Sequence, residues 1–219
     1  MTYHSSFQWA RRAQQTLVLM IGLGALIACQ AQSTGPDPSK YRAVNQPFPV
    51  TTGDKIEVAE LFWFKCGHCF SLEPRLKRWQ ETMPDNAELV KVPAVFSARW
   101  AFEAQAFYTM KALNMPQDAY DQYFIRTHTQ RRYINNVDDL VEFLADYEVT
   151  EKQVTSTFNS FAVDSNMRYA KRVSVQSGAT GVPAMIVDGK YITSVSDAGS
   201  VPAMFEVVEQ LIEKAAAER

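Results

Sequence analysis

The sequence is poor in cysteine and histidine, and this scarcity limits the metal sites that it could build. Among 219 residues there are three cysteines and three histidines. His4 and Cys29 lie in or beside an N-terminal leader, and His68 lies inside a Cys-x-x-Cys motif, so only His128 remains as a further ligand. A four-ligand zinc site would therefore need carboxylates. We predict no metal centre, while a copper-handling protein that adds a methionine to two cysteines stays open.

The chain also lacks a strong charge of either sign. The formal net charge is -2, which gives no indication of nucleic acid or of an anionic membrane surface as a partner. Beyond the N-terminus there is no apolar run of about 20 residues, so we expect no transmembrane helix in the body of the chain. Hydrophobic residues make up 47% of the chain. This length and composition predict one domain, with at most an insertion.

The first 28 residues have the pattern of a lipoprotein signal peptide. Arg11 and Arg12 supply a positive region, and residues 17–28 form an apolar stretch that is short for a membrane span. The stretch ends in Leu26-Ile27-Ala28-Cys29, which resembles the lipobox of bacterial lipoproteins. We expect Cys29 to be lipidated, with palmitate among its acyl chains, and to become the first residue of the mature chain. An ordinary secretory signal and a retained membrane anchor are the alternatives.

Residues 29–40 are expected to be the lipidated cysteine and a flexible linker. Residues 30–39 are polar and rich in Pro, Gly and Ser, a composition that behaves as a tether. The linker is too short to be a dimerisation domain, so we expect a monomer. Gln30 follows Cys29 where Asp would suggest retention in the inner membrane, which favours the outer membrane.

Residues 41–219 predict an α/β domain. Residues 55–64 and 88–96 have the composition of strands, and residues 69–82 between them have the spacing of a helix. Near the C-terminus, Asp188-Gly189 lies between two apolar runs, 184–187 and 190–193, which is the strongest short signal for a hairpin. Residues 201–217 predict a last helix.

A helical block of about 99–177 is expected between the second strand and the hairpin. Its predicted helices are 100–113, 119–128, 137–147 and 151–175, with Asn135 and Thr150 as N-caps. His128 and the nearby arginines Arg126, Arg131 and Arg132 are expected at a solvated helix end. The order of elements is a βαβ unit and a ββα unit with helices inserted between them.

Cys66-Gly67-His68-Cys69 is the motif that carries chemistry. Two cysteines at i and i+3 where a helix starts are close enough to form a disulfide. Unpaired N–H groups and the positive end of the helix dipole favour thiolate, so the pKa of Cys66 is expected below the reference of about 8.5. His68 adds a donor, and Gly67 lets the loop turn. A structural disulfide, a zinc site and a copper site also fit a lone Cys-x-x-Cys.

Two segments together resemble the DsbA proteins of the thioredoxin superfamily. They are Phe62-Trp63-Phe64-Lys65-Cys66-Gly67-His68-Cys69 at a strand-to-helix junction and Gly181-Val182-Pro183-Ala184-Met185-Ile186-Val187-Asp188-Gly189-Lys190-Tyr191. The second is similar to the family's cis-proline segment. The resemblance covers residues 41–219 and implies a thioredoxin fold with an inserted helical domain. DsbA proteins often carry Pro-His where this chain has Gly67-His68, a departure that bears on the strength of the oxidant.

The resemblance also implies roles for further residues. Val182-Pro183 is expected to hold a cis peptide that faces the cysteines and contacts the substrate. Glu60 and Lys91 match an acid and its basic partner that take part in proton movement, and Glu73 matches a second acid near the site. The alternative is that Glu60 and Lys91 extend to solvent at the strand ends.

The implied activity is that of a thiol:disulfide oxidoreductase. It would introduce disulfides into envelope or secreted proteins in the periplasm through Cys66–Cys69, with no other cofactor and with a DsbB-type membrane protein as reoxidant. An envelope disulfide reductase or isomerase and a non-enzymatic metal-binding lipoprotein remain the alternatives.

Overall fold

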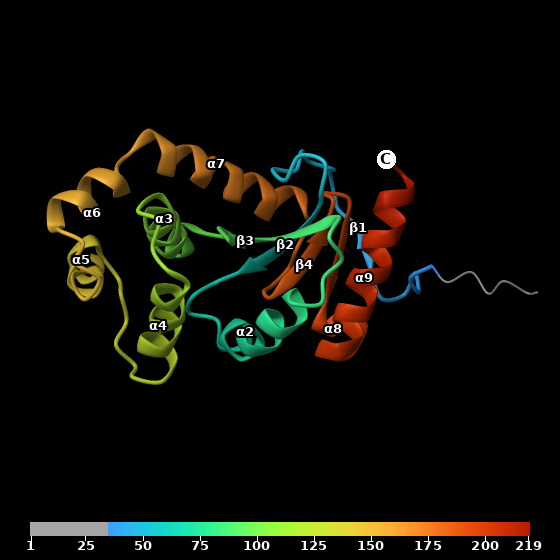
Figure 1. The fold of residues 1–219 in the computed structure, drawn as a ribbon, viewed down its shortest axis with the longest axis horizontal. Coiled ribbons are helices and arrows are strands. Elements are labelled where there is room, and N and C mark those ends of the chain that lie inside the picture. The colour runs from blue at the N-terminus through green and yellow to red at the C-terminus, as the bar shows by residue number, and fades with distance from the viewer. Residues whose placement is uncertain (1–34) are drawn as a thin grey trace, which may run out of the picture. The chain divides into compact units, whose positions relative to one another are not determined.

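The computed structural model describes residues 35–219, and Cys29 with the rest of the expected leader lies outside them. The described residues build a five-stranded sheet in the order β1-β5-β4-β2-β3, with helices on both faces and at one end (Figure 1). The strands are β1 (Arg42–Ala43), β2 (Ile56–Phe62), β3 (Ala87–Pro93), β4 (Ala184–Val187) and β5 (Tyr191–Ser194). None of the helices described over 35–219 has both the length and the apolar character needed to cross a membrane.

Strand β2 is the centre of the sheet. It pairs in parallel with β3 and antiparallel with β4, and all seven of its residues are buried. A strand covered on both faces is expected to be almost continuously apolar. Glu57 and Glu60 break that rule, and the register places Glu60 directly opposite Lys91 of β3.

Helix α2 (Gly67–Gln80) follows β2 directly and packs with α9 (Val201–Ala217) on one face of the sheet. Leu72, Leu76 and Trp79 are the apolar side chains that α2 buries in this core. The short helix α8 (Val195–Ala198) connects β5 to α9, and neither α8 nor β1 was expected from the sequence. The helix predicted for 201–217 is confirmed at both ends.

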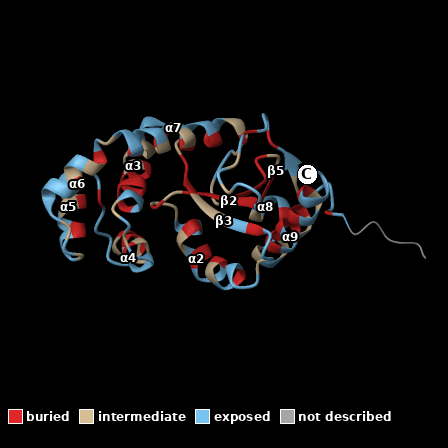
Figure 2. Cartoon of the chain, turned by 45° about the horizontal axis from the view of Figure 1, so that its top comes forward, coloured by how far each residue is buried: buried red, intermediate tan, exposed pale blue. Residues whose placement is uncertain are grey.

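Five helices lie between β3 and β4 and form a second apolar core that is continuous with the other face of the sheet (Figure 2). They are α3 (Ala98–Ala112), α4 (Gln117–His128), α5 (Val137–Ala145), α6 (Glu151–Phe158) and α7 (Phe161–Gln176). The single helix predicted for 151–175 is wrong, because Ser160 accepts a hydrogen bond from the backbone N–H of Val163 and caps a new helix. The N-cap of α5 is Asn136 rather than Asn135, whereas the N-cap at Thr150 is confirmed and forms a capping box with Gln153.

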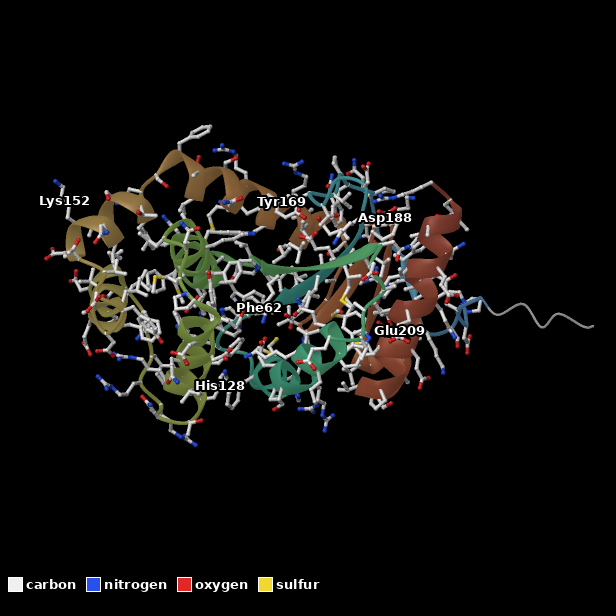
Figure 3. All side chains as sticks on the ribbon, viewed as in Figure 1. Phe62, His128, Lys152, Tyr169, Asp188 and Glu209 are labelled. Carbon is white, nitrogen blue, oxygen red and sulfur yellow. The ribbon has the colours of Figure 1, made fainter. Side chains whose placement is uncertain are left out.

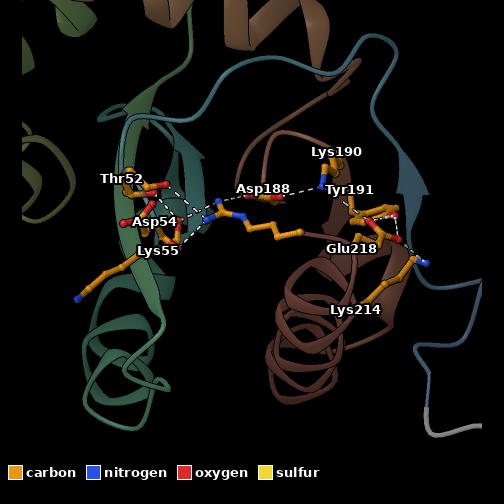
Figure 4. A network of polar contacts seen from close by, with 10 residues as sticks. Thr52, Asp54, Lys55, Asp188, Lys190, Tyr191, Lys214 and Glu218 are labelled. Atoms are coloured by element: carbon orange, nitrogen blue, oxygen red, sulfur yellow. Dashed lines mark hydrogen bonds and ion pairs between the residues drawn. The ribbon is translucent and has the colours of Figure 1, made fainter.

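The predicted Asp188-Gly189 hairpin is also present, and the C-terminus is held against it (Figure 4). Both turn residues have positive φ, 54° and 61°, as a two-residue type I′ turn requires. A Cβ on Gly189 would lie 2.2 Å from the carbonyl oxygen of Phe48, so only glycine fits. The guanidinium of Arg219 donates to the Asp188 carboxylate at 2.5 Å and to the carbonyl oxygen of Asp54 at 2.6 Å. These bonds tie Arg219 both to the hairpin turn and to the segment just before β2.

Candidate active site

Cys66 is the N-cap residue of α2, at the point where β2 passes into that helix. Its Sγ accepts a hydrogen bond from the backbone N–H of Cys69 at 3.3 Å, which is the usual bond of an N-capping side chain. Its own backbone N–H donates to the carbonyl oxygen of Trp63 at 3.0 Å and fixes the preceding turn. Cys66 is half-buried, Cys69 is 0% exposed, and both are free thiols.

The two thiols differ strongly in acidity. A hydrogen bond from the Cys69 thiol, together with the backbone N–H groups of Cys69 and His68, lowers the pKa of Cys66 to about 6 against the effect of burial. Burial raises the pKa of Cys69 far above its usual value, and the charges of Glu60 and Cys66 raise it further. At neutral pH Cys66 is therefore a partly accessible thiolate and Cys69 is a buried thiol, which is the division needed between a nucleophile and a resolving cysteine.

The Val182–Pro183 peptide bond is cis, as expected, and it lies beside Cys66. The Cys66 Sγ is 3.4 Å from the carbonyl oxygen of Val182. A groove of about 740 Å³ runs from this loop along α2, and His68 and Leu72 line its α2 side. An extended peptide that enters this groove would meet the backbone of Val182 next to the reactive sulfur.

Glu60, Lys91 and Glu73 form a buried charged cluster below the cysteines. The Lys91 Nζ is 3.3 Å from a Glu60 carboxylate oxygen, pairs also with Glu73, and lies 4.8 Å from the centre of the Phe62 ring. The alternative in which Glu60 and Lys91 extend to solvent is wrong, since Glu60 is 0% exposed and the Lys91 side chain 18%. Phe62, the last residue of β2, packs against Phe107 of α3 and Phe124 of α4 (Figure 3).

The acidities in this cluster follow from burial and charge. Burial raises the pKa of Glu60 to about 7, although the charge of Lys91 acts in the opposite direction. Burial lowers the pKa of Lys91, but the two carboxylates outweigh it, so the pKa is raised overall and the ammonium stays charged. Glu60 is thus a carboxyl group that can gain or lose a proton near neutral pH, beside a thiol that must do the same.

His128, expected at the surface, instead holds the loop before Cys66. It ends α4 (Figure 3), and its Nε2 is 2.8 Å from the carbonyl oxygen of Phe64. Its ring also stacks on Phe70 of α2, with 5.0 Å between ring centres and 10° between planes. The sequence did not indicate this role, because the contact joins residues 64 positions apart. It showed only that His128 was the one histidine outside the leader and the Cys-x-x-Cys motif.

A second ion pair beside the site was not expected from the sequence. Glu103 of α3 is 1% exposed and pairs with Lys65, the residue immediately before Cys66. The indole N–H of Trp63 also points at the Glu103 carboxylate, at 3.4 Å. In the sequence, Glu103 is a single charged residue within an apolar stretch of α3. That pattern could have indicated a buried carboxylate with a specific partner. The inserted helices therefore contact the residues before Cys66 through both His128 and Glu103.

The comparisons with known proteins agree with this geometry. Residues 92–208 match the family described as a DSBA-like thioredoxin domain. The thiol:disulfide interchange protein DsbA of Pseudomonas aeruginosa is 33% identical over 199 residues, which cover 90% of this chain and 94% of the relative. The chain belongs to the DsbA family. The DsbA of Bordetella pertussis is 34% identical over 193 residues, 88% of this chain and 91% of the relative.

Solved structures confirm the fold class predicted from the sequence. A crystal structure of Pseudomonas aeruginosa DsbA superposes with a TM-score of 0.76 at 34% identity and covers 83% of this chain and 95% of that one. The fold is a thioredoxin fold with a helical domain inserted between its two halves, and the chain is a DsbA-type thiol:disulfide oxidoreductase.

Proposed function

We propose that this DsbA-family chain introduces disulfide bonds into reduced proteins of the bacterial periplasm, with Cys66–Cys69 as its redox centre. The observation that carries the proposal is the contrast between the two thiols. The pKa of the half-buried Cys66 is lowered to about 6, while the pKa of the buried Cys69 is raised. A thiolate that is stable at neutral pH leaves a disulfide easily, so a Cys66–Cys69 disulfide would act as an oxidant.

The reaction begins with the Cys66–Cys69 disulfide and a client dithiol. A client thiolate attacks the Cys66 Sγ, a client–Cys66 disulfide forms, and Cys69 leaves and takes up a proton. The second client thiolate then attacks the client sulfur of this mixed disulfide, and Cys66 leaves as a thiolate. The client loses two electrons, and the protein gains them as its dithiol. A DsbB-type membrane protein would remove these electrons and restore the disulfide.

The remaining site residues support these steps. Glu60 would give a proton to Cys69 when it leaves and take it back on reoxidation, since its pKa of about 7 suits both directions. Lys91 and Glu73 would hold the charge balance around it. Gly67 and His68 would complete the redox motif, and Val182 and Pro183 would pair with the client backbone. No cofactor other than the Cys66–Cys69 disulfide would be needed.

The chain would act as a lipid-anchored monomer. Support comes from the lipobox-like sequence that ends in Cys29, and Gln30 after it favours the outer membrane. Intact mass of the protein extracted from membranes should show an acylated chain that begins at Cys29. A mature chain that begins elsewhere and carries a free Cys29 thiol would overturn the anchor without touching the redox activity.

Oxidation of a reduced client protein tests the activity. The oxidised full-length protein, mixed with a stoichiometric amount of reduced, unfolded client, should give an active client and lose its own disulfide. Cys66→Ser should abolish the transfer, whereas Cys29→Ser keeps both redox cysteines and should retain it. A protein that reduces insulin but leaves the client thiols unoxidised would be a reductase, and the proposal would be wrong.

A further inference from the structure

The groove beside the cis proline carries more positive than negative charge. Arg42 of β1 and Arg75 of α2 line it, and among its lining residues Asp197 is the one carboxylate. Asp197 already accepts a hydrogen bond from the hydroxyl of Ser194 at 2.6 Å. The surplus of charge lies beside the place where a client peptide would meet Cys66.

Neither arginine is neutralised by the surrounding protein. Arg75 is exposed and forms no ion pair with any carboxylate of residues 35–219. Arg42 donates to the carbonyl oxygens of Ser177 and Gly178, which are neutral acceptors and leave its charge in place. A guanidinium with free N–H donors in a groove is suited to bind a carboxylate, because its planar fork matches the two oxygens.

Arg75 is at a distance that a client side chain can span. His68, Ser71 and Arg75 lie three to four residues apart along α2, so they share the face that borders the groove. The nine residues from Cys66 to Arg75 rise about 13 Å along the helix axis. An extended peptide advances about 3.3 Å per residue and covers that distance in about four residues. The long arginine side chain shortens the gap further.

We propose that Arg75, with Arg42 lining the same groove, makes the groove selective for client segments that carry Asp or Glu two to four residues from the reacting cysteine. This inference rests on the proposed function and names the class of client that the same site takes. The carboxylate would pair with the exposed Arg75 guanidinium while the client cysteine reacts at Cys66. Exposed ion pairs are weak, so the selectivity is a preference of about two- to fivefold rather than an absolute requirement.

The test uses three synthetic peptides that differ only in charge. Each has two cysteines, with Glu, Gln or Lys three residues to either side of them. The oxidised full-length protein is mixed with each reduced peptide at pH 7 and low salt, and the rate of peptide oxidation is followed by acid quench and mass spectrometry. The measured quantity is the ratio of the Glu-peptide rate to the Lys-peptide rate. Differences in intrinsic peptide reactivity cancel when this ratio is compared between variants.

We expect the wild-type ratio to exceed the Arg75→Gln ratio by about two- to fivefold. Arg75→Glu should lower the ratio further, and salt at about 1 M should remove the preference because it screens charges beyond about 3 Å. Arg78→Gln is the matched control: it removes the same charge from an exposed site on the same helix that does not line the groove, so the ratio should hold.

Equal ratios in the wild type and Arg75→Gln, with all three peptides oxidised, would overturn the selectivity and leave the proposed function standing. An equal fall of the ratio in Arg78→Gln would also overturn the selectivity, since the effect would then come from the net charge of the protein and not from the groove. If none of the peptides is oxidised, including the neutral one, the proposed function itself is wrong.

Discussion

The lowered pKa of Cys66 predicts how stability depends on redox state and pH. The pKa falls from 9.0 to about 6, chiefly through the hydrogen bond from the Cys69 thiol. The folded-state pKa is depressed, so the stabilisation is complete above the unfolded value near 9 and is lost as pH falls through 6. It exists only in the reduced protein, because the disulfide has no thiol to ionise.

The magnitude follows from the two pKa values. Each unit of pKa is worth 1.36 kcal/mol, so the whole effect is at most about 4 kcal/mol. Proton linkage between the folded and unfolded states makes this stabilisation of the reduced protein about 1 kcal/mol at pH 7 and about 3 kcal/mol at pH 8. Because Cys66 is half-buried and water screens its thiolate, we expect about half of these values. The free energy of unfolding of the reduced protein, minus that of the oxidised protein, should therefore rise by about 1 kcal/mol from pH 6 to pH 8.

Paired urea melts at pH 6, 7 and 8, with and without dithiothreitol, measure this difference. Taking the difference removes groups that titrate alike in both forms. Glu60 is not one of them, because the Cys66 thiolate of the reduced protein raises its pKa, so a variant without the Cys66 thiol is needed as a control. The reduced protein should be the more stable at pH 8, since a disulfide that closes so short a loop gains little from chain entropy. Cys66→Ser cannot form the disulfide, so its free energy of unfolding is compared with that of the oxidised wild type, and this difference should show no such rise. A difference that is flat with pH in the wild type would show that the pKa of Cys66 is not lowered by folding, whatever the absolute value of the difference.

Three further predictions concern residues around the site. Lys91→Met leaves the Glu60 carboxylate buried without its cation, so it should lower the free energy of unfolding in urea melts by about 3–5 kcal/mol. A loss below about 1 kcal/mol would show that Glu60 is already neutral in the wild type. His128→Phe keeps an aromatic ring but leaves the Phe64 carbonyl without its donor, so it should lower the free energy of unfolding by about 1–2 kcal/mol and slow client oxidation. His128→Gln can restore the hydrogen bond, so it should recover part of the stability and part of the oxidation rate. Arg219→Ala should lower the thermal midpoint with no change in the rate of client oxidation; a slower oxidation would contradict a purely structural role.

Local chemistry made part of this fold predictable from the sequence. The Asp188-Gly189 turn was found because type I′ geometry needs residues that tolerate positive φ at both positions. The cap at Thr150 was predictable because threonine just before a helical stretch is a favoured N-cap, and the structure adds a capping box with Gln153 that the sequence analysis did not name. The break at Ser160 was missed because apolar spacing continues across it, and periodicity does not register a single backbone turn.

Contacts between distant residues could not be predicted in the same way. Strand β1 has only two residues and exists because Arg42 and Ala43 pair with β5, which lies about 150 residues later. Glu103 and His128 reach the active-site loop only after the inserted helices have packed on β2. Glu60 and Lys91 were placed together by family resemblance, and the β2–β3 register gives the physical reason.

Thiol trapping in living cells tests whether this protein acts as an oxidase. Cells that express the full chain are quenched in acid, free thiols are alkylated with a reagent of known mass, and the chain is analysed before and after reduction. We expect most of the protein to carry the Cys66–Cys69 disulfide at steady state and to become reduced when its membrane reoxidant is removed. A protein that holds both cysteines as free thiols in growing cells would contradict its assignment as an oxidase.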